Sequence, residues 1–246
     1  MRITEQITNI EYEETKQFFK SRAGKFHEDN PYAVTMYQDN NKELVKQRNR
    51  METEKLYPLL KLNTDSRVLD IACGIGRWAD AIKTDIEEYC GLDFSRELIE
   101  IARKRNERGN FFFFEGAANA IEKVLQVHGR SKYNTILMIG ILMYLNDEDI
   151  IDALKQIERN CEQKTVICIR EPVGIKDRLT LKNDFSDELQ DNYNAIYRTR
   201  DEIMGFLKEA FLEKGFVIKE ENFLFEDDSL NNRKETAQYY FILERE

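Results

Sequence analysis

Residues 68–79 read VLDIACGIGRWA, and this stretch decides the fold. It begins as an apolar run typical of a buried strand, turns through two glycines and ends where a helix can begin. Gly74 and Gly76 can adopt positive φ angles and let a ligand approach the backbone closely. The first turn of the helix beyond them has N–H groups without intrahelical partners. The stretch therefore predicts a strand, a ligand-binding loop and a helix, in that order.

Short apolar, β-rich runs alternate with longer helical patterns through the rest of the chain. The first five runs are typical of buried strands in a mostly parallel sheet. The last two follow one another without a helix, so they predict an antiparallel hairpin. We therefore expect an α/β fold, doubly wound and Rossmann-like, with a mostly parallel seven-stranded sheet and an antiparallel C-terminal hairpin. The seven runs cover residues 67–72, 88–92, 110–114, 134–139, 165–169, 216–225 and 238–243.

The domain organisation follows from the position of these runs. We expect residues 1–246 to form a single domain, because no repeat or flexible linker interrupts the pattern. Its core comprises residues 61–172 and 199–246. Residues 1–60 look helical and form an N-terminal lid, and residues 173–198 form an insert on the substrate side. The lid and the insert are the expected walls of a substrate pocket.

The charge balance argues against a polyanionic partner. The chain has 46 acidic and 37 basic side chains, with a formal net charge of −9. A nucleic acid is repelled on average by such a chain, so we expect a small-molecule acceptor. There is no apolar signal segment and no run long enough to span a membrane, which favours a cytoplasmic protein without a membrane partner. The sequence does not specify an oligomeric state.

The cysteines indicate a reducing compartment. All four sit in or beside apolar runs and none forms a C-x-x-C pair, so we interpret them as reduced core residues. The two histidines are isolated from them in the sequence, and no metal site is expected. The residues are Cys73, Cys90, Cys161 and Cys168, with His27 and His128.

Two classes of cofactor bind to a strand followed by a glycine loop. The spacing Gly74-x-Gly76-x-x-Ala79 fits the fingerprint of NAD-binding folds. Asp70, however, precedes this loop, and a carboxylate there would repel a pyrophosphate. S-adenosyl-L-methionine (SAM) has no phosphate, and its sulfonium and ammonium groups suit a neighbouring carboxylate. Asp70 therefore favours SAM over NAD.

Asp93 ends the second apolar run, where its carboxylate can accept hydrogen bonds from the ribose hydroxyls of either cofactor. The alternative interpretation of Asp93 is a helix cap. Ser95 already supplies a cap for the helix that follows, so we expect Asp93 to bind the ribose.

These segments resemble motif I and the acidic loop of class I SAM-dependent methyltransferases. The order of the later elements is similar as well, and the resemblance covers residues 67–246, with residues 1–60 as the variable lid of that family. It implies a reaction that converts SAM to S-adenosyl-L-homocysteine (SAH). The cofactor-binding residues that it implies are Asp70, Ala72, Gly74 and Gly76 at the methionine end and loop, Asp93 at the ribose, Phe94, Ala117 and Ala118 at the adenine, and Ile139 beneath the cofactor.

Ala117 departs from the pattern of this family. Many members have an acidic residue at this position, which accepts a hydrogen bond from the adenine amino group. Its absence leaves that contact open, although the backbone N–H of Ala118 can still reach the ring.

Methyl transfer is an in-line displacement, and the enzyme mainly holds two reactants in line and excludes water. A general base is needed only when the accepting atom carries a proton at neutral pH, and an anionic oxygen needs none. His27 and Glu171 are the candidate bases in this sequence. The alternative for His27 is a structural residue of the lid.

Candidate acceptor-binding residues come from lid segment 30–40, from the ends of the fourth and fifth runs, and from residues 193–200. Arginine donates forked hydrogen bonds to oxyanions, so the arginines among them predict an anionic acceptor. The alternative is a buried aromatic hinge in the lid, with salt bridges and surface charges elsewhere. The candidates are Tyr32, Tyr37, Tyr144, Arg170, Tyr197 and Arg198.

Residues 31–41 together with residues 193–200 also resemble methyltransferases of bacterial capsule-polysaccharide loci, among them enzymes proposed to O-methylate phosphoramidate decorations. This resemblance implies a small anionic acceptor oxygen, on a phosphoramidate or a related intermediate of capsular polysaccharide biosynthesis. Two alternatives stay open. One is an N- or O-methyltransferase of a nucleotide-linked sugar, and the other is a SAM-binding regulatory protein without turnover.

Overall fold

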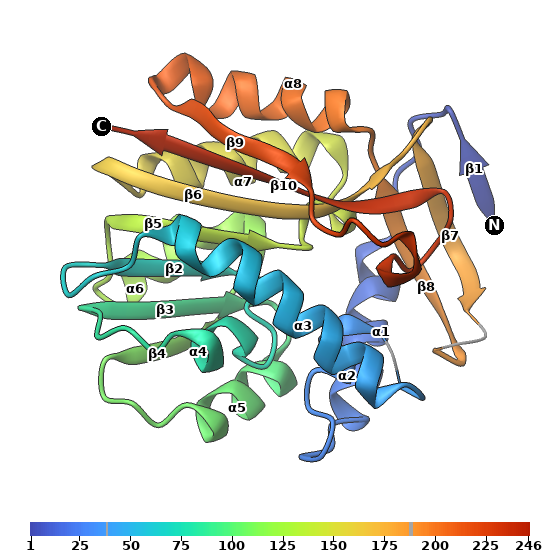
Figure 1. Ribbon diagram of the computed structural model, residues 1–246, viewed down its shortest axis with the longest axis horizontal. Coiled ribbons are helices and arrows are strands. Elements are labelled where there is room, and N and C mark those ends of the chain that lie inside the picture. Colours follow the sequence, from blue (N-terminus) through green and yellow to red (C-terminus); the bar gives the residue numbers. More distant parts are fainter. Residues whose placement is uncertain (38, 187–188) are drawn as a thin grey trace.

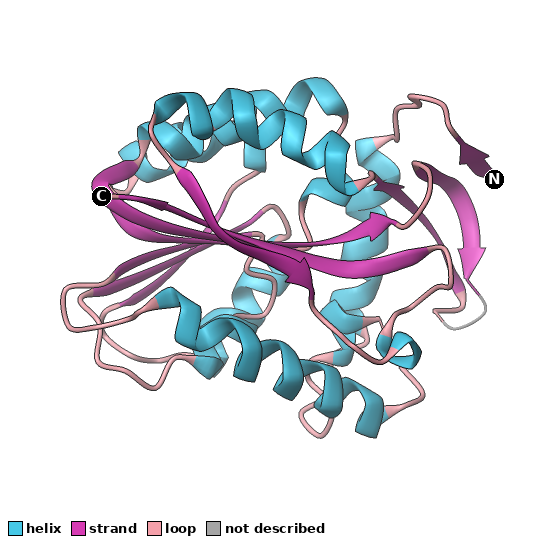
Figure 2. Cartoon of the chain, turned by 45° about the horizontal axis from the view of Figure 1, so that its top comes forward, coloured by secondary structure: helices cyan, strands magenta, loops and turns pink. Residues whose placement is uncertain are grey.

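A twisted sheet runs through the middle of the molecule, and helices cover both of its faces (Figure 1, Figure 2). The computed structural model describes residues 1–37, 39–186 and 189–246. Gln38 of the expected lid segment and residues 187–188 of the expected insert lie outside the described residues.

The strands of this sheet are β2 (Arg67–Ile71), β3 (Glu88–Asp93), β4 (Phe111–Glu115), β5 (Tyr133–Ile139), β6 (Cys161–Gly174), β9 (Val217–Phe223) and β10 (Thr236–Arg245). Their order across the sheet is β4-β3-β2-β5-β6-β10-β9. Strands β2 to β6 are parallel, and β10 is antiparallel to both β6 and β9. The expected doubly wound, mostly parallel sheet with an antiparallel C-terminal hairpin is confirmed.

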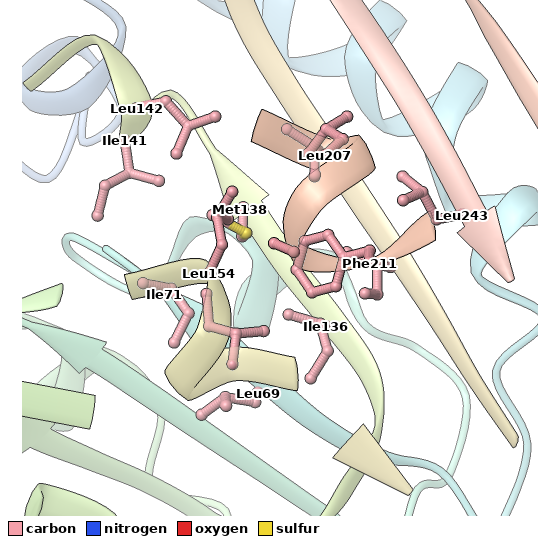
Figure 3. Close-up of a cluster of buried hydrophobic side chains, with 14 of the residues drawn as sticks. Leu69, Ile71, Ile136, Met138, Ile141, Leu142, Leu154, Leu207, Phe211 and Leu243 are labelled. Carbon is pink, nitrogen blue, oxygen red and sulfur yellow. The ribbon is translucent and has the colours of Figure 1, made fainter. Parts of the chain in front are cut away.

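Helices α6 (Ile121–Val127), α7 (Asp147–Arg159) and α8 (Arg200–Ala210) cover one face of the sheet. Apolar side chains from α7 and α8 meet those of β2 and β5 there, as Figure 3 shows for Leu154, Leu207 and Met138. These side chains are at most 1% exposed. Burial of each contributes roughly 1.5–3 kcal/mol, so this layer is a main source of stability.

Helices α3 (Lys42–Leu56), α4 (Arg77–Ala81) and α5 (Arg96–Arg105) cover the opposite face. Leu56, Trp78 and Ile99 are buried there with Val68 of β2 and Leu137 of β5. Helix α3 belongs to the N-terminal segment, so the expected lid also forms part of the core.

A second, three-stranded sheet was not expected from the sequence. It consists of β1 (Arg2–Thr4), β7 (Leu179–Ser186) and β8 (Asp191–Tyr197), in the order β1-β7-β8. The expectation of a wholly helical segment 1–60 is therefore wrong at its start, where β1 pairs antiparallel with β7. The rest of that segment is helical, with α1 (Tyr12–Gly24) and α2 (Ala33–Met36) preceding α3.

Strand β6 is longer than the apolar run that predicted it. Its residues up to Arg170 pair with β5, and the residues from Glu171 to Gly174 continue the ladder to β10 beyond the end of β5. The pairing partner therefore extends the strand past the apolar residues, through Arg170, Glu171 and Pro172.

The N-terminal segment is tied to the core through Asn146, the residue before α7. Its Oδ1 accepts a hydrogen bond from the N–H of Ile10 at 2.9 Å, and its Nδ2 donates to the Ile10 carbonyl at 3.2 Å. Both residues are buried.

We expect Asn146→Ala to lower the free energy of unfolding by about 1–3 kcal/mol, because two buried backbone groups of Ile10 lose their partners. Urea denaturation followed by circular dichroism measures this change. An unchanged midpoint would mean that another contact holds the segment.

Candidate active site

A cavity of about 670 Å³ lies at the carboxyl ends of the parallel strands. Ligands of doubly wound folds bind at this edge, and the volume is typical of small-molecule sites. Its walls come from the ends of β2 to β6, from the N-terminal segment, from the second sheet and from the loop between β9 and β10. The cavity therefore lies between the core, residues 1–60 and residues 173–198.

The glycine loop forms one wall of the cavity. Gly74 has a φ of 56°, and a Cβ atom built on it would lie 2.8 Å from Cγ2 of Thr35 in the lid. Only glycine allows the lid to approach this closely. Gly76, with a φ of 78°, starts α4 and packs against Asn106, and it does not line the cavity.

The carboxylate of Asp93 is held at the end of β3 and lines the cavity. It accepts hydrogen bonds from the N–H groups of Gly74 and Ser95, both at 2.9 Å. Ser95 Oγ accepts from the N–H of Leu98 and caps α5, as expected. Each carboxylate oxygen keeps a second lone pair, which suits the two hydroxyls of a ribose. Burial raises the pKa of Asp93 to about 6.

The expected adenine end of the site lies beside Asp93. Phe94, Ala117 and Ala118 line the cavity together with Ala72 of the glycine loop and Ile139 of β5. The ring of Phe94 meets Phe19 of α1 edge to face, with centroids 5.4 Å apart. Most of the cofactor-binding residues implied by the resemblance therefore meet in one place.

Asp70 lies outside this wall, contrary to the sequence-based expectation. Its carboxylate is 2% exposed and accepts a hydrogen bond of 2.5 Å from the hydroxyl of Tyr89. It does not line the cavity. Burial raises the pKa of Asp70 to about 7. Asp70 sits within β2 and faces the neighbouring strand, so its charge does not contact a ligand directly.

The same cavity is also lined by residues outside the expected cofactor-binding set, and we call the part that they line the acceptor chamber. Two pairs of tyrosines line it. The hydroxyl of Tyr144 donates to that of Tyr37 at 2.7 Å, and the hydroxyls of Tyr193 and Tyr197 are 2.6 Å apart. The chamber is lined by Tyr37, Tyr144, Tyr193, Tyr197, Arg48, Glu52, Arg170, Arg233 and Gln238.

Arg170, a candidate acceptor-binding residue, lines this chamber. Its guanidinium pairs with Glu52 of α3 at 2.8 Å and donates to Gln238 of β10 at 3.1 Å. Its Nε is buried without a hydrogen-bond partner among the described residues. Glu52 also pairs with Arg77 at the start of α4, and the two arginines hold the pKa of this carboxyl below its ordinary value despite its burial.

Arg233 and Arg48 also line the chamber, and neither was expected there from the sequence. Arg233 follows the short helix η5 (Asp228–Leu230) and donates from Nε to the hydroxyl of Tyr193 at 3.1 Å. Arg48, one helical turn before Glu52, donates to the carbonyl of Asn231 at 3.2 Å. Both come from segments that read as ordinary polar surface in the sequence.

Arg198 does not line the chamber. Its side chain is 1% exposed and pairs with Asp147, and it donates to the carbonyls of Leu142 and Leu145 at 2.8 and 2.7 Å. Through these contacts the guanidinium of Arg198 joins the insert to the segment that follows β5. Arg198 therefore holds buried parts of the chain together, whereas the sequence predicted that it binds the acceptor.

The two candidate bases also lie away from the cavity lining. His27 is exposed in the turn after α1. Glu171 is buried, and its carboxylate accepts hydrogen bonds from the N–H groups of residues 141–143 at 2.7–3.3 Å. Burial raises the pKa of Glu171 to about 7. Tyr32 likewise lies outside the lining and donates to Asp80 at 2.9 Å.

Neither a metal cluster nor a membrane-spanning helix is found in the part of the chain that the structure describes. No group of three or more histidine, cysteine, aspartate or glutamate residues could hold an ion there. None of the helices described is long and apolar enough to cross a membrane.

Comparison with known proteins agrees with this site. Residues 68–164, from β2 to the start of β6, match a family model described as a methyltransferase domain. No curated protein matches the sequence. This part of the chain is therefore similar to methyltransferase domains, and the matched segment includes the glycine loop and Asp93.

Solved structures share the whole fold at low sequence identity. A SAM-dependent methyltransferase of Leishmania major is 14% identical, with a TM-score of 0.63, and the match covers 96% of this chain and 87% of that one. Magnesium protoporphyrin IX methyltransferase of Synechocystis, solved with SAM, is 13% identical, with a TM-score of 0.61 and coverages of 94% and 95%. The fold is that of the class I SAM-dependent methyltransferases.

A third structure is phosphoethanolamine N-methyltransferase 1 of Haemonchus contortus, solved with phosphoethanolamine and SAH. It is 17% identical, with a TM-score of 0.69, and the match covers 95% of this chain. This chain spans half the length of that protein.

We expect the affinity for SAH to fall as the pH is lowered through about 6, because Asp93 gains a proton there and loses acceptor capacity toward the ribose. If only the carboxylate form binds, the dissociation constant rises about tenfold per pH unit below the pKa. Isothermal titration between pH 5 and 8 measures this. Asp93→Asn should remove the dependence, whereas Asp70→Asn should retain it.

We expect Arg198→Met to lower the free energy of unfolding by about 3 kcal/mol, because two carbonyls and Asp147 lose a buried partner. Thermal denaturation of the purified variant measures the change. Normal stability combined with a raised KM for the acceptor would return Arg198 to the acceptor site.

Proposed function

We propose that the protein transfers a methyl group from SAM to an anionic oxygen of a small acceptor. The single observation that carries this proposal is the acceptor chamber, where three arginines and four tyrosines line the same cavity as the expected cofactor-binding residues. When bound, SAM supplies a sulfonium methyl group, which passes to the acceptor oxygen as the carbon–sulfur bond breaks and its electron pair stays on sulfur in SAH.

The charges of the chamber favour an anion. Arg48, Arg170 and Arg233 line it, against the single carboxylate of Glu52 among the described residues of the chamber. Glu52 is already paired with Arg170 and Arg77. A chain with a net charge of −9 has thus gathered positive charge at one place, and arginine binds oxyanions with directional donors.

The acid–base groups of the cavity favour an acceptor that is already ionised. No histidine lines the cavity among the described residues. Asp93 is held by two N–H groups, and Glu52 by two arginines that stabilise its charged form. Asp149 and Asp184 also line the cavity, where Asp149 accepts a hydrogen bond from the hydroxyl of Tyr12 and Asp184 pairs with Arg2 and the N-terminal ammonium. Protein donors thus engage all four of the described carboxylates, and an anionic oxygen does not need a base. The chain's task is then to orient the oxygen and to exclude water.

A phosphoramidate or a related intermediate of capsular polysaccharide biosynthesis is the acceptor that we favour. The sequence resemblance of residues 31–41 and 193–200 to methyltransferases of capsule loci supports it. The similar fold of a protein solved with phosphoethanolamine supports an acceptor that carries a phosphoryl group. The buried, unpaired cysteines support a reducing, cytoplasmic setting.

A panel of acceptors tests this proposal. Formation of SAH is measured with phosphoramidate, with nucleotide-linked sugars and with no acceptor. Turnover with phosphoramidate alone supports the proposal, and turnover with a nucleotide-linked sugar amine or hydroxyl replaces it with the second acceptor class. Tight SAH binding without turnover on any acceptor would indicate a regulatory protein.

We expect Arg170→Gln and Arg233→Gln each to reduce kcat/KM for the anionic acceptor by roughly 10- to 150-fold, because a charge-assisted contact contributes about 1.5–3 kcal/mol. The affinity for SAH should stay nearly constant. Steady-state kinetics and titration with SAH measure both. The matched control is Arg96→Gln, an exposed arginine of α5 that pairs with Glu100. Unchanged acceptor kinetics in both chamber variants would contradict the anionic acceptor.

A further inference from the structure

Tyr37 has a backbone conformation that bulky residues rarely adopt. It follows α2 with φ 56° and ψ 47°, in the left-handed region. A conformation of this kind is unfavourable for a residue with a side chain, and it persists where the surrounding structure imposes it. Strained residues concentrate at ligand sites, and Tyr37 lines the acceptor chamber.

Arg22 of α1 fixes the turn that contains Tyr37. Its side chain is fully buried, and it donates to the carbonyl of Ala33 at 2.5 Å and to that of Val34 at 3.2 Å. Two further hydrogen bonds, of 2.6 and 2.7 Å, join it to the carboxylate of Asp39. Arg22 thus holds the chain on both sides of Tyr37, and its guanidinium lies 5.9 Å from the centre of the Tyr37 ring.

The hydroxyl of Tyr37 has a defined direction of hydrogen bonding. It accepts a hydrogen bond from the hydroxyl of Tyr144, with the two oxygens 2.7 Å apart, so its own proton must point elsewhere. No described residue accepts this proton in a hydrogen bond. The electrostatic neighbours of Tyr37 include Arg170 and Tyr193, which both line the chamber. This half-buried hydroxyl can therefore donate a hydrogen bond to a ligand oxygen in the chamber.

We propose that Tyr37 is a specificity-determining residue whose hydroxyl donates a hydrogen bond to the acceptor oxyanion. Arg22 is then a positioning residue that holds Tyr37 in its strained conformation for this contact. This inference rests on the proposed function, because it assumes an acceptor with an anionic oxygen. It adds a neutral donor, fixed by the lid, to the charged donors of Arg170 and Arg233.

The phenol is suited to donate rather than to remove a proton. Burial raises the pKa of Tyr37 above its ordinary value of 10, although the hydrogen bond from Tyr144 and the charge of Arg22 act in the opposite direction. The hydroxyl therefore stays protonated at neutral pH. An ammonium group at the same place would face this donor and the guanidinium of Arg170, so the contact selects oxygen acceptors over charged amines.

Binding of phosphoramidate to the SAH-bound protein tests this role without relying on turnover. Tyr37→Phe removes only the hydroxyl, and we expect the dissociation constant of phosphoramidate to rise at least tenfold, while that of SAH changes less than twofold. The matched control is Tyr57→Phe. The hydroxyl of Tyr57 bonds to Thr84 outside the cavity, and both constants should match the wild type.

Arg22→Lys keeps the charge and loses the forked donors. We expect it to weaken phosphoramidate binding as Tyr37→Phe does, and the double variant should bind no more weakly than Tyr37→Phe alone, because both changes remove one contact. Should Arg22→Lys fail to fold, Asp39→Asn loosens the same turn and takes its place. Additive losses would show that Arg22 acts through general stability, which overturns its positioning role.

The outcomes separate this inference from the proposed function. If the wild-type protein binds no phosphoramidate and methylates no oxyanion, both are overturned. If the wild type binds phosphoramidate and Tyr37→Phe binds it equally well, the proposed function stands and the role of Tyr37 is overturned. A loss of thermal stability in Tyr37→Phe with unchanged binding has the same meaning, because it assigns the strained turn to packing alone.

Discussion

The carboxylate of Asp93 joins the ends of two neighbouring strands, and the geometry of the cavity depends on it. The parallel register of β2 and β3 places the glycine loop beside the end of β3, where one oxygen of Asp93 accepts from Gly74 and the other from Ser95. The loop, the following helix α5 and the carboxylate are thereby fixed to one another. Burial disfavours the charged form of Asp93 and these hydrogen bonds favour it. Burial has the larger effect and raises the pKa of Asp93 to about 6.

A second carboxylate links the cofactor side of the cavity to the acceptor chamber. Glu52 comes from the N-terminal segment and lies between Arg77, directly after the glycine loop, and Arg170, within β6. Removing one member of such a buried group leaves uncompensated charge on the others. The lid is therefore held by electrostatics as well as by apolar contacts, and the chamber and the glycine loop share one anchoring residue.

The sequence predicted those features that depend on local patterns. Apolar runs and the glycine loop gave the seven strands, and the position of Asp93 at the end of its run gave its place in the cavity. Features that depend on pairing across the chain could not be predicted. β1 is only three residues long, and β7 and β8 mix polar and apolar residues without a clear period. The sequence pointed to Arg198 and not to Arg233, and only their distant partners show that Arg198 forms a buried ion pair whereas Arg233 lines the chamber.

The β7–β8 hairpin is inserted between the last parallel strand, β6, and helix α8, and it forms its own sheet with β1. It supplies Tyr193 and Tyr197 to the chamber, while the glycine loop and Asp93 belong to the seven-stranded sheet. Substitutions in the hairpin can therefore accumulate without disturbing the strand ends that frame the expected cofactor site. In evolutionary terms, a new acceptor preference can arise by replacing a wall instead of rebuilding the sheet.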